Sequence, residues 1–350
     1  MTEIEIDNRV LGIGHKTLVV AELGVNHDGN VQRALDLVVA AASCGADAVK
    51  LQVFRANTLM HASSSMAEYQ KQRTKAENPI DMLRKYELTG AEIRRVVQRT
   101  RELNMIPLAT PFSWQDLETV ESLRLPAIKI ASPDLVNRPL LEGAAALRLP
   151  LLISAGAASH DEVATSVEWL REWGSSFALL HCVSAYPTPI EQANLCWIAE
   201  LARDFDCAVG YSDHTTDIAS GALAVAAGAC IIEKHLTYNR SAPGPDHAAS
   251  ADPQQFERYV KRIREAEVLV GSPGKRVLPI EEDVRKVSRQ SLVVRRSLKP
   301  GETLRPEDLT FQRPGTGLPA AMIDQAIGRR VNREITAGSL LQWDMLTDAA

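Results

Sequence analysis

The chain has 350 residues, of which 45% are hydrophobic and 24% are charged, as in an ordinary globular protein. That length exceeds one ordinary core, so we expect one large domain and one small domain. The net charge of −5 provides no general basic field, which argues against nucleic acid or an anionic membrane as a partner.

Short apolar runs alternate with helical patterns from residue 17 to about residue 270. The runs are almost continuously apolar, as in strands that are buried on both faces. In chain order, the expected strands are Thr17–Ala21, Ala48–Val53, Ile106–Ala109, Ala127–Ala131, Leu151–Ser154, Phe177–His181, Ala208–Tyr211 and Cys230–His235.

A helical pattern follows each of these strands. The expected helices are Val31–Cys44, Ala91–Leu103, Trp114–Leu123, Arg138–Leu147, Asp161–Trp173, Leu195–Arg203, Asp217–Ala227 and Pro253–Val270. Strict alternation implies a parallel sheet, and eight units in about 250 residues is the size of a (β/α)8 TIM barrel. An open doubly wound sheet is the structural alternative, although no Gly-x-Gly-x-x-Gly follows the first strand.

One connection between a strand and its helix, residues 54–88, is unusually long. Long loops at this position are usually lids or binding arms, and a plain surface insertion is the alternative.

The pattern changes after Gly271. We expect a catalytic barrel domain at 1–271, a Pro/Gly/charge-rich linker at 272–290 and a small domain at 291–350. The small domain should have short strands, turns at Pro300–Gly301 and Pro314–Gly315, and one helix at Pro319–Ile327. About 60 residues bury little core alone, so we expect this domain to pack on another surface, plausibly that of a partner subunit.

Polar residues concentrate where the expected strands end, which is where barrel enzymes place their chemistry. Lys50 and Lys129 interrupt apolar strands, and lysine is rarely buried without a partner. With hydroxyl groups nearby they would form a binding site for a phosphate and a carboxylate. The hydroxyl groups are those of Thr110, Ser132, Ser154 and Ser212. The alternative is two separate lysine–carboxylate pairs, formed with Glu22 and Glu233.

His214 and His235 follow neighbouring strands and are candidate ligands of one divalent ion. Glu22 or Asp246 would add oxygen atoms, and a mixed set of this kind suits Mn²⁺ better than structural zinc. His181 is interpreted as structural. The stretch SAPGPDHAAS is either a rigid loop that presents Asp246 or a simple turn.

The five cysteines are scattered and form no CxxC pair, which is typical of reduced core cysteines in a cytoplasmic protein. No basic stretch followed by an apolar one opens the sequence, so we expect no signal peptide. No apolar run approaches the ~20 residues of a membrane helix.

Several motifs together resemble the sialic acid (N-acetylneuraminate) synthase family, which includes legionaminate and pseudaminate synthases. They are VAELGVNHDGN, ADAVKLQVF, TPF, KIAS, HCVSAYPTP, GYSDHT, EKHLT, GPDHAAS and, in the tail, RPGTGL. The resemblance implies a transferase that condenses phosphoenolpyruvate with an open-chain amino-sugar aldehyde, such as N-acetylmannosamine, and releases phosphate by C–O cleavage. It also implies a TIM barrel, a C-terminal antifreeze-like (SAF) domain and a domain-swapped homodimer.

The resemblance also implies roles for individual residues. Phosphoenolpyruvate would bind Lys50, Thr110, Lys129, Ser132, Ser154 and Ser212; the sugar acceptor would bind Gln52, Asp134, Ser184, Tyr186, Asp246 and Arg313. Arg313 would come from the partner's small domain. His214 and His235 would hold a divalent metal, Mn²⁺ first and Mg²⁺ or Co²⁺ as alternatives. Glu22, Lys50, Lys129 and Asp246 would be catalytic, with Glu22 or Asp246 as the acid/base.

This chain departs from the family on the acceptor side. It reads Ser132-Pro133-Asp134 where sialic-acid-making members have Ser-Gly-Glu, and Ser184 where Asn is frequent. Two other functions stay open at this point. One is a phosphoenolpyruvate-dependent 3-deoxy-ulosonate synthase that acts on a shorter sugar phosphate. The other is an inactive barrel that binds carbohydrate.

Overall fold

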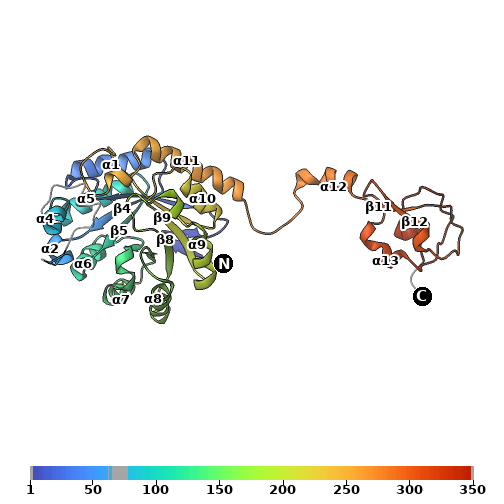
Figure 1. Cartoon of the computed structure of the whole chain (residues 1–350), viewed down its shortest axis with the longest axis horizontal. Coiled ribbons are helices and arrows are strands. Elements are labelled where there is room, and N and C mark those ends of the chain that lie inside the picture. Colours follow the sequence, from blue (N-terminus) through green and yellow to red (C-terminus); the bar gives the residue numbers. More distant parts are fainter. Residues whose placement is uncertain (1–2, 62, 65–77, 348–350) are drawn as a thin grey trace. The chain divides into compact units, whose positions relative to one another are not determined.

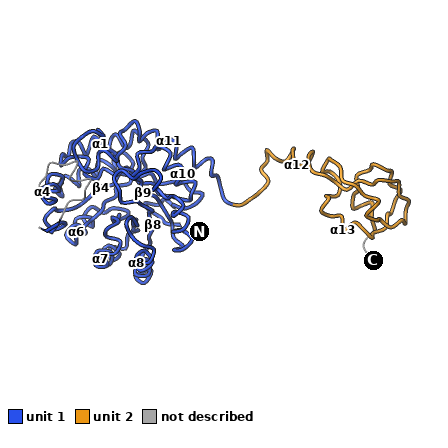
Figure 2. The backbone as a smooth tube through the Cα atoms, viewed as in Figure 1, with its two compact units in different colours: residues 1–273 blue, residues 274–350 orange. Residues whose placement is uncertain are grey.

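The computed structural model describes residues 3–61, 63–64 and 78–347. The chain forms two compact units, residues 1–273 and 274–350, which Figure 2 colours separately.

The first unit is built on a closed barrel of eight parallel strands, surrounded by helices (Figure 1). Around the barrel the strands follow the order β10-β3-β4-β5-β6-β7-β8-β9. Closure confirms the predicted TIM barrel and excludes the open doubly wound sheet. The strands are β3 (Leu18–Gly24), β4 (Ala48–Val53), β5 (Ile106–Pro111), β6 (Ile128–Ile130), β7 (Leu151–Ser154), β8 (Phe177–Cys182), β9 (Ala208–Asp213) and β10 (Ile231–His235).

The outer helices bury one apolar stripe each, and most of them begin at a polar cap residue. In α1, Ala34, Leu37 and Val38 face the barrel, and Ser159 caps α8 by accepting a hydrogen bond from the Glu162 N–H. The helices are α1 (Val31–Ser43), α5 (Gly90–Glu102), α6 (Trp114–Ser122), α7 (Arg138–Ala146), α8 (His160–Glu172), α9 (Cys196–Phe205), α10 (Ser220–Ala226) and α11 (Pro253–Val270). Helix α10 begins later than predicted, because the Asp217 carboxylate accepts hydrogen bonds from the N–H groups of residues 219 and 220.

An antiparallel hairpin that the sequence analysis did not predict, β1 (Ile4–Ile6) and β2 (Arg9–Leu11), precedes the barrel. Ile4, Ile6 and Leu11 are buried in one apolar cluster with inward-facing residues of the strands, such as Leu18 and Ile231. The hairpin therefore closes the amino-terminal end of the barrel.

Asp47 forms several hydrogen bonds and ion pairs at this end of the barrel. Its carboxylate accepts hydrogen bonds from the Val19 N–H and Lys16 Nζ, both at 2.9 Å, and forms ion pairs with Arg9 and Arg264. Burial alone would raise the pKa of Asp47, but the Arg264 charge and these hydrogen bonds outweigh it and lower the pKa.

The described part of the long connection after β4 includes the short helices α2 (Ala56–Leu59) and α4 (Pro79–Arg84). Met82 and Tyr86 pack with Val25 and Phe54, so the end of this connection is fixed on the barrel. Residues 62 and 65–77 lie outside the described residues, and the lid or binding arm expected here stays a prediction.

The second unit contains α12 (Glu282–Ser288), β11 (Ser291–Val294), β12 (Leu309–Gln312) and α13 (Ile323–Ala326). β11 and β12 pair antiparallel, and Leu292, Leu304 and Leu341 belong to the unit's own apolar core. The helix predicted at Pro319–Ile327 is shorter, because residues 320–322 form a 3-10 turn. In the part of the chain that the structure describes, no helix combines the length and apolar character needed to cross a membrane.

Candidate active site

Along most strands of the barrel, the inward-facing side chains are apolar near the amino-terminal end and polar near the carboxyl-terminal end. Strand side chains alternate between faces, so residues two apart share one face. On β3, Leu18 and Val20 belong to the apolar cluster at the amino-terminal end, and the next inward position is Glu22. The other polar inward positions are Lys50 and Gln52 (β4), Thr110 (β5), Lys129 (β6), Ser154 (β7), Ser212 (β9), and Glu233 and His235 (β10). These side chains lie together at the carboxyl-terminal mouth.

Both predicted lysines belong to one buried ionic cluster rather than to two separate pairs. Lys50 Nζ lies 2.9 Å from Glu233 Oε1 and 3.2 Å from Glu22 Oε2, and Lys129 Nζ lies 3.5 Å from Glu233 Oε1. Ser212 Oγ donates to the same Glu233 oxygen at 3.0 Å. Glu233 therefore holds both ammonium groups at one point.

The shared burial of this cluster changes its ionisation. Burial, opposed by the charge of Lys50, raises the pKa of Glu22 to about 7. Burial, opposed by the charge of Glu233, lowers the pKa of Lys129 to about 8. With Glu22 protonated, two ammonium groups face one carboxylate, so the cluster carries a net positive charge that suits an anion.

Thr110 and Ser154 each place a buried hydroxyl group at the barrel mouth. Among the described residues, neither Thr110 Oγ1 nor Ser154 Oγ has a hydrogen-bond partner, although both atoms are buried. An unpaired buried hydroxyl is costly, which indicates that a ligand completes this site.

Gly156 brings three further side chains together. A Cβ atom at Gly156 would lie 2.5 Å from Ser184 Oγ, 2.8 Å from Ser132 Oγ and 3.0 Å from Cys182 Sγ. Ser132 Oγ accepts a hydrogen bond from the Gly156 N–H at 3.0 Å. Glycine at this position thus lets the loops after β6, β7 and β8 approach each other closely.

The two predicted metal ligands are neighbours at the same mouth. The ring centroids of His214 and His235 are 5.6 Å apart, and the Tyr186 ring lies 4.1 Å from that of His214. His214 Nδ1 is 2.9 Å from the Val183 carbonyl oxygen, and His235 Nδ1 is 3.8 Å from Asp246 Oδ2.

The ionisation of the two imidazoles differs. Burial, together with the charges of His214 and Lys50, holds the pKa of His235 well below its usual value, so this ring is neutral. Burial also acts to lower the pKa of His214, but the Cys182 sulfur and the Val183 carbonyl give a net rise. Both imidazoles would have to be neutral to hold a divalent ion, because metal ligands must be deprotonated.

These residues fit a divalent ion with an open coordination sphere. His235 Nδ1 is buried and has no hydrogen-bond partner among the described residues. Those residues include no group of three or more His, Cys, Asp or Glu side chains placed to hold a metal ion. With His214 as the second imidazole, the protein would supply two nitrogen ligands and leave positions for water or substrate.

The residues predicted to bind the sugar acceptor lie in several different parts of the chain. Gln52 Nε2 donates to Glu22 Oε1 at 3.3 Å, and Ser184 and Tyr186 lie in the loop after β8. Asp134 accepts a hydrogen bond from Asn137 Nδ2 at 3.0 Å in its own 3-10 turn. Arg313 belongs to the second unit, where it is exposed directly after β12.

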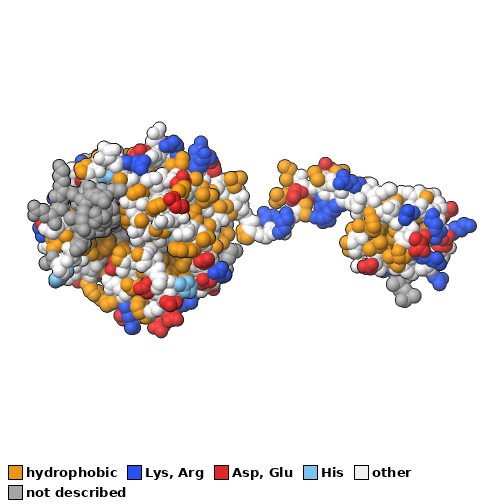
Figure 3. Space-filling view, in the orientation of Figure 1, with side chains coloured by type: hydrophobic (Ala, Val, Ile, Leu, Met, Phe, Trp, Pro, Cys, Tyr) orange, Lys and Arg blue, Asp and Glu red, His pale blue; other side chains and the backbone are white. Residues whose placement is uncertain are grey.

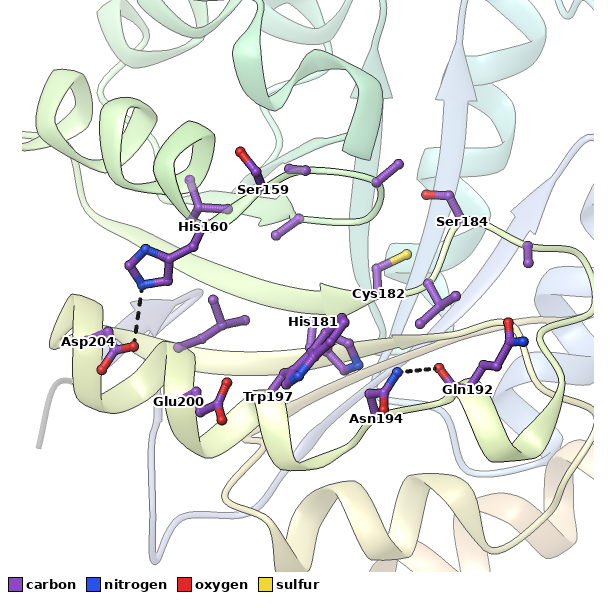
Figure 4. Close-up of a pocket in the computed structure, with 17 residues that line it drawn as sticks. Ser159, His160, His181, Cys182, Ser184, Gln192, Asn194, Trp197, Glu200 and Asp204 are labelled. Atoms are coloured by element: carbon purple, nitrogen blue, oxygen red, sulfur yellow. Dashed lines mark hydrogen bonds and ion pairs between the residues drawn. The ribbon is translucent and has the colours of Figure 1, made fainter.

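A pocket of about 700 Å³ lies between α8 and α9, next to the loop after β8 (Figure 4). Its lining is largely apolar and includes no lysine or arginine, so it does not suit a phosphate. His181 lines this pocket on the outer side of β8, stacked on Tyr211, and its Nε2 lies 2.8 Å from the Ala193 carbonyl oxygen. This placement agrees with the structural role expected for His181.

Sequence reasoning missed the parts played by Glu233 and Gly156. Glu233 was noted at a strand end only as one possible partner of a lysine, although its place two residues before His235 puts both on the inward face. The signal for Gly156 was weak, because a single glycine after a strand is also typical of an ordinary turn.

Comparisons with known proteins identify the family of this chain. The NeuB family matches residues 37–275, and the SAF domain matches residues 289–347. The chain is 39% identical over 332 residues to N,N'-diacetyllegionaminic acid synthase from Legionella pneumophila, an alignment that covers 93% of each chain. It is 31% identical to pseudaminic acid synthase from Helicobacter pylori, over 93% of this chain and 96% of that protein.

A solved structure shows the same likeness in three dimensions. N-acetylneuraminic acid synthetase from Leptospira borgpetersenii superimposes with a TM-score of 0.73 at 31% identity, covering 81% of this chain and 95% of that one. The resemblance found in the sequence motifs is therefore confirmed, and the chain belongs to the NeuB family.

Proposed function

We propose that this protein is a nonulosonate synthase. It condenses phosphoenolpyruvate with an open-chain N-acyl amino-sugar, such as N-acetylmannosamine, and releases phosphate. One observation carries the proposal: the buried ammonium groups of Lys50 and Lys129, with the unpaired hydroxyls of Thr110 and Ser154, lie at the same barrel mouth as two adjacent imidazoles.

The ionic cluster would bind phosphoenolpyruvate. Lys50 and Lys129 provide the charge for its phosphate and carboxylate, and hydroxyl groups provide hydrogen bonds. These hydroxyls are Thr110, Ser132, Ser154 and Ser212. Glu233 accepts from Lys50 Nζ, which has further N–H groups for the ligand, and from the Ser212 hydroxyl, which would turn away from Glu233 to donate to the ligand.

The acceptor would lie above this anion, on the side of His214 and His235. Its contacts would come from Gln52, Asp134, Ser184, Tyr186 and Asp246. We propose that Arg313 of a second copy of the chain completes the acceptor site.

A divalent ion, Mn²⁺ first and Mg²⁺ or Co²⁺ as alternatives, would be held by His214 and His235. When bound, it supplies Lewis-acid polarisation of the acceptor's aldehyde oxygen.

In the reaction, C3 of phosphoenolpyruvate forms a bond to the aldehyde carbon, whose oxygen takes up a proton. Water then adds at C2 and gives up one proton. The bond between C2 and the phosphate oxygen breaks, and the new C2 hydroxyl loses its proton to become the keto group as phosphate leaves. Glu22, whose pKa of about 7 suits a group that exchanges protons at neutral pH, is the first candidate for the acid/base. Asp246, beside His235, is the second.

Isotopic labelling tests this course. Phosphoenolpyruvate carrying ¹⁸O at the bridging position should give labelled phosphate when the protein turns over with Mn²⁺ and N-acetylmannosamine or a 2,4-diacetamido-trideoxy hexose. Label kept in the sugar acid would mean P–O cleavage and would contradict the proposal. Phosphate release with short sugar phosphates alone would favour the 3-deoxy-ulosonate synthase alternative.

We also propose that the active form is a domain-swapped homodimer. Hydrophobic side chains are exposed on and next to α12, including Ile280, Val284 and Val287, as the orange surface around this helix shows (Figure 3). Several exposed apolar side chains gathered on one short segment favour a protein partner. Light scattering of the intact chain should give twice its 38.3 kDa mass. A monomer with full activity would contradict this proposal.

A further inference from the structure

Asp213 and Lys234 directly precede the two candidate metal ligands, His214 and His235, on neighbouring strands. Because side chains alternate along a strand, Asp213 and Lys234 point outward, toward α10 and α11, while the imidazoles face the mouth. Both are buried, and their positions are directly paired in the register of β9 and β10.

On this outer face, both carboxylate oxygens of Asp213 accept hydrogen bonds from several side chains and one backbone N–H. Its Oδ2 accepts from Lys234 Nζ at 2.9 Å, from Ser220 Oγ at 2.6 Å and from Tyr259 OH at 2.7 Å. Its Oδ1 accepts from the Thr215 N–H at 2.8 Å and from Tyr211 OH at 3.2 Å. One carboxylate therefore ties β9 and β10 to both covering helices.

This network holds the backbone on both sides of His214. Asp213 binds the Thr215 N–H, and Lys234 Nζ donates to the Thr215 carbonyl oxygen. The His214 carbonyl oxygen itself accepts from the Thr188 N–H at 2.9 Å. Lys234 in turn belongs to the strand that carries His235, so the pair links the backbones that carry the two imidazoles.

Packing alone does not require such a network. A buried ion pair loses so much solvation that an apolar pair of similar size would stabilise the barrel about as well. The directional hydrogen bonds of Asp213 and Lys234 instead fix the geometry of the turn after β9.

We infer that Asp213 and Lys234 are positioning residues that set the separation and orientation of His214 and His235 for a divalent ion. The inference rests on the proposed function, because it takes the two imidazoles as the metal ligands. Neither residue touches the ion or the substrate. They act through the histidines that follow them.

The test measures Mn²⁺ affinity of the intact protein, by calorimetry and by the electron paramagnetic resonance of free Mn²⁺. Asp213→Asn should weaken Mn²⁺ binding about 10- to 100-fold, the range found when groups behind a metal ligand are changed. Tyr259→Phe and Ser220→Ala each remove one hydrogen bond to Asp213, and we expect losses of about two- to five-fold. These mild variants carry the test if Asp213→Asn does not fold.

Two controls separate positioning from general damage. Asp47→Asn removes the charge of a half-buried, ion-paired carboxylate at the opposite end of the barrel and should leave Mn²⁺ affinity unchanged. Phosphoenolpyruvate binding without metal should stay within about two-fold in Asp213→Asn, because Lys50 and Lys129 face the other side of the strands.

The outcomes are distinguishable. If His214→Ala loses Mn²⁺ binding while Asp213→Asn and Tyr259→Phe keep it, the positioning role is overturned and the metal site stands. If Asp213→Asn loses metal and phosphoenolpyruvate binding together, the residue is a structural support and the inference is also overturned. If His214→Ala binds Mn²⁺ as the unchanged protein does, the proposed metal site itself is wrong.

Discussion

The two ends of the barrel are made from the same eight strands but differ in how their polar groups are paired. At the amino-terminal end, Ile4, Ile6 and Leu11 close an apolar cluster, and the nearby Asp47 carboxylate is paired with basic groups and a backbone N–H. At the mouth, Thr110 and Ser154 present buried hydroxyls without partners among the described residues. The closed end contributes stability, and the open end keeps unmet hydrogen-bonding capacity for a ligand.

The strongest test of this contrast removes a charge at the mouth. Lys129→Met should lower kcat/KM for phosphate release by about 1,000-fold, because a buried donor to the reacting anion is lost. The free energy of unfolding should change little, since Glu233 keeps Lys50 as its partner and a buried ammonium group is removed. Steady-state kinetics measures the loss of kcat/KM, and thermal unfolding measures the change in stability. An active Lys129→Met would refute the assigned role of this lysine.

The matching change at the closed end should have the opposite profile. Leu11→Ala removes a fully buried side chain and should lower the free energy of unfolding by about 3 kcal/mol. The Kd for phosphoenolpyruvate, measured by calorimetry below the unfolding temperature, should not change. A large loss of ligand affinity would show that the two ends are coupled.

The ionisation of the mouth predicts a pH dependence of binding. As the pH rises through the Glu22 pKa of about 7 and the Lys129 pKa of about 8, the cluster first gains a negative charge and then loses a positive one. Phosphoenolpyruvate affinity should therefore fall about ten-fold between pH 7 and pH 8.5, where its phosphate, with a second pKa near 6, is already doubly ionised.

Glu22→Gln is the control for that experiment. It should bind phosphoenolpyruvate at least as tightly and lose only the part of the pH dependence that lies near pH 7. An unchanged profile in Glu22→Gln would assign the titration to another group. The comparison uses binding rather than turnover, because Glu22 is also a candidate acid/base.

The smallest expected effect concerns the paired carboxylate at the closed end. Asp47 has a lowered pKa in the folded protein, so its contribution is fully present above its ordinary pKa of 3.8 and is lost as the pH falls through the folded value. Asp47→Asn should cost about 1 kcal/mol of stability at pH 7, with the difference disappearing below pH 3.8. Urea unfolding at both pH values measures this. A difference that persists in acid would point to lost packing rather than lost charge.

Sequence reasoning predicted the barrel well because its signal repeats. Eight apolar runs alternate with eight amphipathic segments, and the polar residues at strand ends follow from the two-residue period of a strand. The family comparisons confirm the resemblance that the motifs carried.

The misses have physical causes. The β1–β2 hairpin is short, and its stability comes from burial against strands far along the chain, which local pattern does not reveal. The shared role of Glu233 depends on which strands become neighbours when the barrel closes. The acceptor contacts assigned to Asp134 and Arg313 stay predictions.

The hairpin that closes the barrel also has a consequence for synthesis. Ile4 leaves the ribosome long before Ile231, yet both belong to the same apolar cluster. At roughly 5–20 residues per second, the wait between them is on the order of ten to forty seconds. During that time the hairpin's apolar face has no completed surface to cover, so this cluster can form only after the last strand of the barrel has been made.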